Sequence, residues 1–122
     1  MKISILGTEY SISKVKYDQD PDFAKNSING YCDPALKQIV ICDMSTYPGY
    51  EDYTKESWAI TEQDTLRHEI VHAFFNESGL QDCSLQPAGP WAKNEEMIDW
   101  IALVGPRIMR AWQEAGALPQ RV

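Results

Sequence analysis

Two histidines, His68 and His72, lie four residues apart, and Glu69 follows the first of them directly. On an α-helix, residues four apart project from the same side, about 6 Å apart along the axis, so two such imidazoles could bind one metal ion together. Zinc accepts imidazole nitrogens in tetrahedral geometry, and a catalytic site keeps one position for water. A glutamate beside the first ligand can take a proton from that water. The alternative is a helix with two incidental histidines on its flank.

A zinc site of this kind needs a third protein ligand, and the chain has no third histidine. The longer metzincin motif would require glycine at position 75 and histidine at position 78, where this chain has Phe75 and Ser78. The metzincin type is therefore excluded. Asp82 and Cys83 follow in a predicted loop and are weaker candidates.

Glu95 and Glu96 are stronger candidates, because they begin the next predicted helix. At 100° per residue, Glu95 lies nearer than Glu96 to the apolar stripe of that helix, which includes Ile98 and Ile101. Both glutamates also have a purely structural explanation, since acidic side chains favour the positive end of the helix dipole. The residues alone thus favour Glu95 and leave Glu96 open.

The segment Asn94-Glu95-x-x-x-Asp99 resembles the gluzincin metallopeptidases, HExxH proteins whose third ligand is a Glu on a following helix. This resemblance implies that Glu95 is the ligand and that Asp99 orients a ligand histidine. The wider layout is similar to small metallopeptidase-like proteins of phages and prophages. The matching stretches cover roughly the second half of the chain: Thr65–His72, Ser78–Leu80 and Asn94–Trp100.

The resemblance implies a minimal zincin-like domain that binds one Zn²⁺ and hydrolyses peptide bonds through a metal-activated water, as a hydrolase of the metalloendopeptidase type. Its substrate would be a peptide or protein, and the gene would belong to a phage or prophage. The alternative is a catalytically silent, zinc-stabilised binding or regulatory protein with the same fold. Glu69 favours catalysis, because a purely structural zinc site needs ligands but no base.

Peptide hydrolysis also needs a donor for the negatively charged oxygen that forms on the attacked carbonyl group. With both histidines assigned to the metal, a Tyr or Arg would have to serve. Tyr47, Tyr50 and Tyr53 precede the motif helix and are candidates, although packing is their more common role. The segment 38–42 could form an edge strand beside the cleft, on which an extended substrate would pair.

Length and composition fit a single domain over residues 1–122, and the resemblance implies that this domain is metallopeptidase-like. The chain is 43% hydrophobic and 24% charged, which is typical of a globular domain. A net charge of −7 without a basic patch argues against nucleic-acid binding. We expect no membrane span, since no apolar run approaches about 20 residues. Three cysteines without a paired spacing indicate reduced thiols and a cytoplasmic location.

The strands are expected in the first third of the chain. Alternating apolar residues predict a hairpin over residues 1–16, with Gly7-Thr8-Glu9 as its turn. Residues 17–29, which are polar and interrupted by Pro21, are predicted to form a loop that could include one helical turn. A second hairpin is expected over residues 30–43, where consecutive apolar residues indicate a strand covered on both faces.

The helices are expected in the second half. Residues 43–58 should form a loop, and a helix capped by Thr61 should run to Gly79. After a loop over residues 80–93, a second helix should begin at Asn94 and end near Gly116, broken or kinked at Gly105-Pro106. Strands followed by helices indicate an α+β fold: a small N-terminal β-sheet, then the motif helix and a C-terminal helix.

Overall fold

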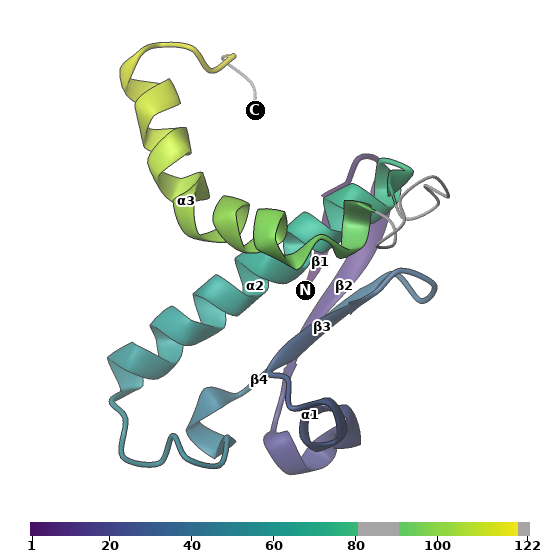
Figure 1. Ribbon diagram of the computed structural model, residues 1–122, viewed down its shortest axis with the longest axis vertical. Helices are drawn as coiled ribbons and strands as arrows, with labels where there is room; N and C mark the ends of the chain where they lie inside the picture. Colours follow the sequence, from purple (N-terminus) through teal and green to yellow (C-terminus); the bar gives the residue numbers. More distant parts are fainter. Residues whose placement is uncertain (81–90, 120–122) are drawn as a thin grey trace.

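A computed structural model of the chain describes residues 1–80 and 91–119 (Figure 1). A four-stranded sheet and three α-helices account for its regular structure, which confirms the predicted α+β class. The elements in chain order are β1 (Lys2–Ile5), β2 (Thr8–Val15), η1 (Tyr17–Gln19), α1 (Pro21–Asn26), β3 (Gly30–Asp33), β4 (Gln38–Cys42), η2 (Met44–Thr46), α2 (Lys55–Glu77), η4 (Trp91–Lys93) and α3 (Glu95–Glu114).

The N-terminal hairpin is present, but its turn is shorter than the sequence predicts. Ile5 already pairs with Thr8, so that only Leu6 and Gly7 form the turn. Both have positive φ angles, 49° and 87°, as the central residues of a type I′ turn do. Such a turn matches the right-handed twist of the two strands that it joins.

The sheet has the order β1-β2-β4-β3, with β2 and β4 parallel and the other pairs antiparallel. Strand β4 is therefore central, and the expectation that segment 38–42 lies at the edge is wrong; β3 is the edge strand. The consecutive apolar residues of β4 are covered on both faces, as predicted. Ile39 and Ile41 pack towards α2, whereas Val40 and Cys42 pack towards α1. Such a run is typical of a strand buried between two layers.

The segment predicted as a loop over residues 17–29 contains helix α1. Asp20 caps this helix, since its carboxylate accepts a hydrogen bond from the Asp22 amide at 3.0 Å, and Pro21 occupies the first turn. An aspartate followed by proline is a recognised helix start. Phe23, which α1 contributes, is fully buried beneath the sheet.

Helix α2 begins seven residues before the predicted start, because its cap is Thr54 and not Thr61. Thr54 is the cap, because its hydroxyl accepts a hydrogen bond from the Ser57 amide at 3.1 Å. Thr61 lies inside the helix, and its hydroxyl donates to the Ser57 carbonyl. The helix ends at Glu77, and Gly79 follows with a φ of 84°, in agreement with the predicted end.

Helix α3 begins after Asn94 as predicted, and it continues through Gly105 and Pro106. Of the two outcomes expected at these residues, a break or a kink, the break is absent. The helix bends near its middle and lies across α2 (Figure 1). Proline has no amide hydrogen, and Pro106 therefore leaves the carbonyl of Ala102 without its helical donor. Arg67 on α2 replaces that donor, since its Nε donates to the Ala102 carbonyl oxygen at 2.9 Å.

Of the helices in the described part of the chain, none combines the length and apolar character needed to cross a bilayer.

We expect the effects of Arg67→Met and Pro106→Ala on stability to be coupled. In the parent chain, Arg67→Met should lower the free energy of unfolding by about 1–2 kcal/mol, because it leaves the Ala102 carbonyl without a partner. With alanine at position 106, the helix supplies its own donor, and Arg67→Met should cost clearly less. Urea denaturation of the four proteins measures this double-mutant cycle. An equal cost in both backgrounds would mean that the two residues act independently.

Candidate metal centre

Strand β3 lies close to helix α2 at Gly30. A Cβ atom at this position would lie 2.6 Å from Cγ2 of Thr65, so only glycine allows the strand to lie this near the helix. Pockets of ≈ 310 and ≈ 330 Å³ lie between the two elements. Gly30, His68 and Glu69 line both pockets. The motif residues therefore lie where the two hollows adjoin, below the edge strand.

One ligand atom each from His68, Glu69 and His72 lies within 4.8 Å of the others, so the three side chains could hold a metal ion. Glu69 is buried and the histidines are half-buried. The predicted helical spacing accounts for this cluster, because all three residues lie within one turn of α2.

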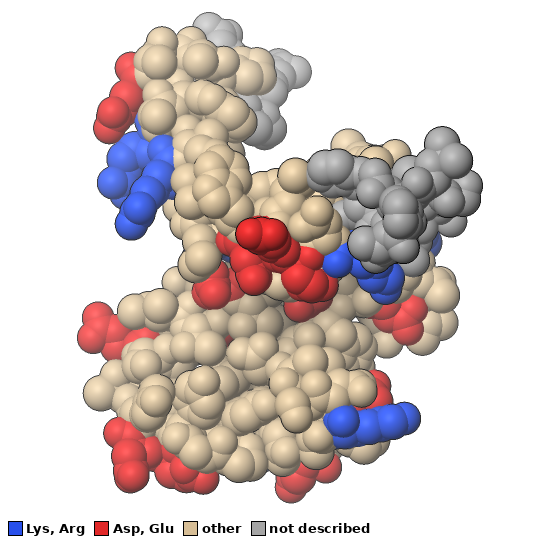
Figure 2. Space-filling view, in the orientation of Figure 1, with Lys and Arg blue, Asp and Glu red and all other residues tan. Residues whose placement is uncertain are grey.

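Glu95 reaches the same point from α3. Its two carboxylate oxygens lie 3.0 Å from Nε2 of His68 and 3.0 Å from Nε2 of His72. Asn94 holds the start of this helix, because its side chain accepts a hydrogen bond from the Met97 amide at 3.0 Å. Figure 2 shows acidic side chains gathered where this half of α3 meets the rest of the protein.

Each histidine is also held through its second ring nitrogen. Nδ1 of His68 lies 2.8 Å from a carboxylate oxygen of Asp99, and Nδ1 of His72 lies 2.7 Å from the carbonyl oxygen of Ala92. A carbonyl oxygen can only accept, so Nδ1 of His72 must bear the hydrogen. In a neutral imidazole, Nε2 then carries a lone pair directed at Glu95.

This arrangement fits a cation. Two Nε2 atoms and a carboxylate converge, and electron-rich atoms at such distances repel one another unless a proton or a metal ion lies between them. Two imidazole nitrogens and a carboxylate oxygen are donors that zinc accepts, and Asp99 and the Ala92 carbonyl hold the rings as outer partners do in zinc sites. Glu95 and Asp99 stay about 60% exposed, which leaves this side of the cluster open.

Burial dominates the electrostatics of the cluster. It raises the pKa of Glu69 to about 7, an effect that the His68 charge opposes and the Glu95 charge reinforces. Burial also lowers the pKa of His72, against the hydrogen bond to Ala92 and the charge of Glu95. Both shifts favour the neutral forms, because burial penalises the charged form of each group.

The raised pKa of Glu69 predicts that the metal-free protein loses stability as the pH rises. Between pH 4.5 and about 7, the unfolded chain releases the Glu69 proton while the folded chain keeps it. The free energy of unfolding should fall by roughly 3 kcal/mol over this range. The lowered pKa of His72 acts in the opposite direction, so the effect is isolated by comparing the parent with Glu69→Gln.

The comparison uses urea denaturation of chelator-treated protein at several pH values. The difference in stability between parent and Glu69→Gln should grow in favour of the variant as the pH rises, because glutamine does not ionise. A difference that stays constant from pH 4.5 to 7 would contradict a raised pKa for Glu69.

The other sequence candidates lie elsewhere. Glu96 lines a separate surface pocket with Met97 and Trp100, and Asp82 and Cys83 fall outside the described residues.

The three tyrosines proposed as oxyanion donors form an edge-packed series. The ring centroids of Tyr47 and Tyr50 lie 5.6 Å apart, and those of Tyr50 and Tyr53 lie 4.8 Å apart. Tyr47 and Tyr50 pack against the core cluster that includes Phe23, and none of the three lines either pocket beside the histidines. Packing is therefore their role.

Sequence reasoning missed two contributors from the segment before α3, the Ala92 carbonyl and Lys93, which lines the pocket. The only signal was their position next to Asn94-Glu95.

A scan against protein-family models finds no matching family, and searches of curated proteins and of solved structures find no match either.

Proposed function

We propose that this protein is a zinc-dependent metallopeptidase, with His68, His72 and Glu95 as ligands of one Zn²⁺ and Glu69 as the general base. The observation that carries the proposal is the convergence of both histidine Nε2 atoms on the Glu95 carboxylate, 3.0 Å from each. The outer contacts to Asp99 and Ala92 support it, because they orient both rings. A structural zinc site would not need Glu69.

The chemistry divides between the metal and the protein. Zinc, when bound, would act as a Lewis acid that lowers the pKa of water towards 7 and polarises a carbonyl group. Glu69 takes the proton of the attacking water and later delivers it to the amine that leaves. Asp99 and the Ala92 carbonyl keep both histidines in the tautomer that presents Nε2.

The edge strand supports a peptide as the substrate. Among the described strands, β3 pairs only with β4, and Gly30, Tyr31 and Cys32 from β3 line the pocket that contains His68, Glu69 and His72. An extended peptide could therefore add to the free edge of β3 and pass beside Glu69. This role falls to β3 and not to segment 38–42, because β4 is hydrogen-bonded on both sides.

Zinc content of protein purified without chelator tests the first half of the proposal. We expect one zinc per chain in the parent and little in His72→Ala, because a zinc site with two remaining protein ligands is weak. Circular dichroism of both metal-free proteins should show that the variant is folded. An absence of zinc in the parent, even after zinc is added back at neutral pH, would contradict the proposal.

A further inference from the structure

We propose that Lys93 supplies the positive charge that stabilises the oxyanion during peptide hydrolysis. This inference rests on the proposed function and deepens it. The reaction needs such a donor, and the tyrosines considered for that role pack elsewhere.

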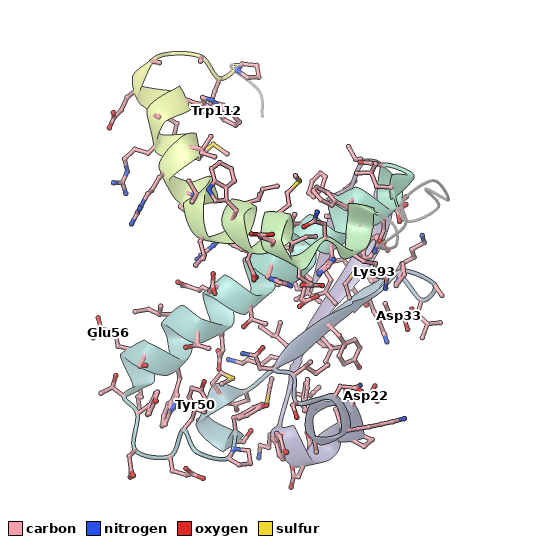
Figure 3. All side chains as sticks on the ribbon, in the orientation of Figure 1. Asp22, Asp33, Tyr50, Glu56, Lys93 and Trp112 are labelled. Atoms are coloured by element: carbon pink, nitrogen blue, oxygen red, sulfur yellow. The ribbon has the colours of Figure 1, made fainter. Side chains whose placement is uncertain are left out.

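The backbone of Lys93 is tied to the candidate metal centre. Lys93 ends η4, and the preceding residue, Ala92, is fully buried. The Ala92 carbonyl accepts the hydrogen bond from Nδ1 of His72 at 2.7 Å. Figure 3 labels Lys93 beside β3, between the edge strand and the start of α3. The base of the side chain is thus fixed next to His72, and Lys93 is an exposed residue that also lines the pocket of His68 and Glu69.

Charge distinguishes Lys93 from the other residues of this pocket. Glu69 and Glu95 are acidic, and Lys93 is the only Lys or Arg among the described residues that line the pocket. Among the described residues, Lys93 forms no salt bridge. The charge of Lys93 also acts on another residue of the pocket, Cys32. Burial raises the pKa of the Cys32 thiol to about 12, and the charge of Lys93 lowers that pKa.

The reaction creates one negative charge that this ammonium group can meet. When the water oxygen bonds to the carbonyl carbon, the π electrons of the C=O bond move to the carbonyl oxygen, and Glu69 receives the proton that the water loses. The C–N bond then breaks, the C=O bond re-forms, and the amine leaves with the proton from Glu69. An ammonium group that donates to the oxygen stabilises the state between these two events.

The test compares two inhibitors of zinc-loaded protein. A phosphinic peptide mimics the tetrahedral oxyanion, whereas a peptide hydroxamate chelates zinc without that geometry. Lys93→Met removes the charge at similar length, and Lys25→Met on α1 is the matched control with the same change in net charge. We expect Lys93→Met to weaken phosphinate binding by about 10–100-fold, with little effect on the hydroxamate or on zinc content. Lys93→Arg should retain most of the affinity, and Lys25→Met all of it.

Turnover gives a second readout. Lys93→Met should lower kcat by about 10²–10³-fold and change KM much less, since the charge is needed after the substrate has bound. Unchanged phosphinate affinity in Lys93→Met, or an equal loss for both inhibitors, overturns the role of Lys93 while zinc binding and hydrolysis by the parent stand. A parent that binds no zinc overturns the proposed function and the role of Lys93 together.

Discussion

Glu69→Gln is expected to lower kcat for peptide hydrolysis by about 10²–10⁴-fold while the protein keeps one zinc per chain. Glutamine has the size of glutamate and fits the same buried position on α2, but it cannot take the proton of the attacking water. Cleavage of an unstructured protein such as casein, followed by mass spectrometry of the products, measures the loss. Zinc analysis of the same samples shows whether the metal site is intact.

The fold should tolerate a neutral side chain at position 69, because the Glu69 carboxyl is buried and that burial raises its pKa. Replacing it with a neutral amide should therefore not unfold the protein. Two outcomes would contradict general-base catalysis. Hydrolysis at the parent rate in Glu69→Gln would show that another group takes the proton. A zinc-loaded parent that cleaves nothing would instead favour a zinc-stabilised binding or regulatory protein.

Glu95→Ala is expected to weaken zinc binding by at least about 100-fold, whereas Glu96→Ala should leave it nearly unchanged. The two variants form a matched pair, because both remove one acidic side chain from the first turn of α3. Any general effect of charge or helix dipole is therefore common to both. Only Glu95 lies 3.0 Å from both Nε2 atoms, whereas Glu96 lines a separate pocket.

Competition with a chromophoric chelator at neutral pH measures the two affinities. Asp99→Asn adds an intermediate case, since it leaves all three ligands but weakens the partner that orients His68; a loss of about 10–100-fold is expected. Equal losses in Glu95→Ala and Glu96→Ala would show that the third ligand has been assigned wrongly.

Local patterns predicted the parts of the fold that depend on a few neighbouring residues. The apolar run of β4 indicated a strand covered on both faces, and Asn94 and Gly79 marked helix ends where the structure has them. The spacing of four residues between His68 and His72 likewise predicted that their side chains lie together, because helix geometry alone determines this. The start of α2 was missed, because most of residues 55–60 are exposed and the apolar residues among them, Trp58, Ala59 and Ile60, are consecutive and so show no helical period.

The remaining features depend on how distant segments meet. The identity of the edge strand depends on the parallel pairing of β2 with β4, which no local pattern encodes. The approach of Glu95 to the histidines depends on how α3 crosses α2, and helical spacing could only favour it over Glu96. The contact between His72 and Ala92 joins residues 20 positions apart through a backbone carbonyl. Every residue has such a carbonyl, so the residue type at position 92 could not predict this contact.

The hydrogen bond from Arg67 to the Ala102 carbonyl has an evolutionary consequence. Proline at position 106 creates the need for a donor, and Arg67 meets that need from another helix. During descent, either residue could be lost at lower cost once the other had changed. Homologous chains that lack proline at this position should therefore be free to vary at the position of Arg67. The two positions should covary although they lie 39 positions apart along the chain.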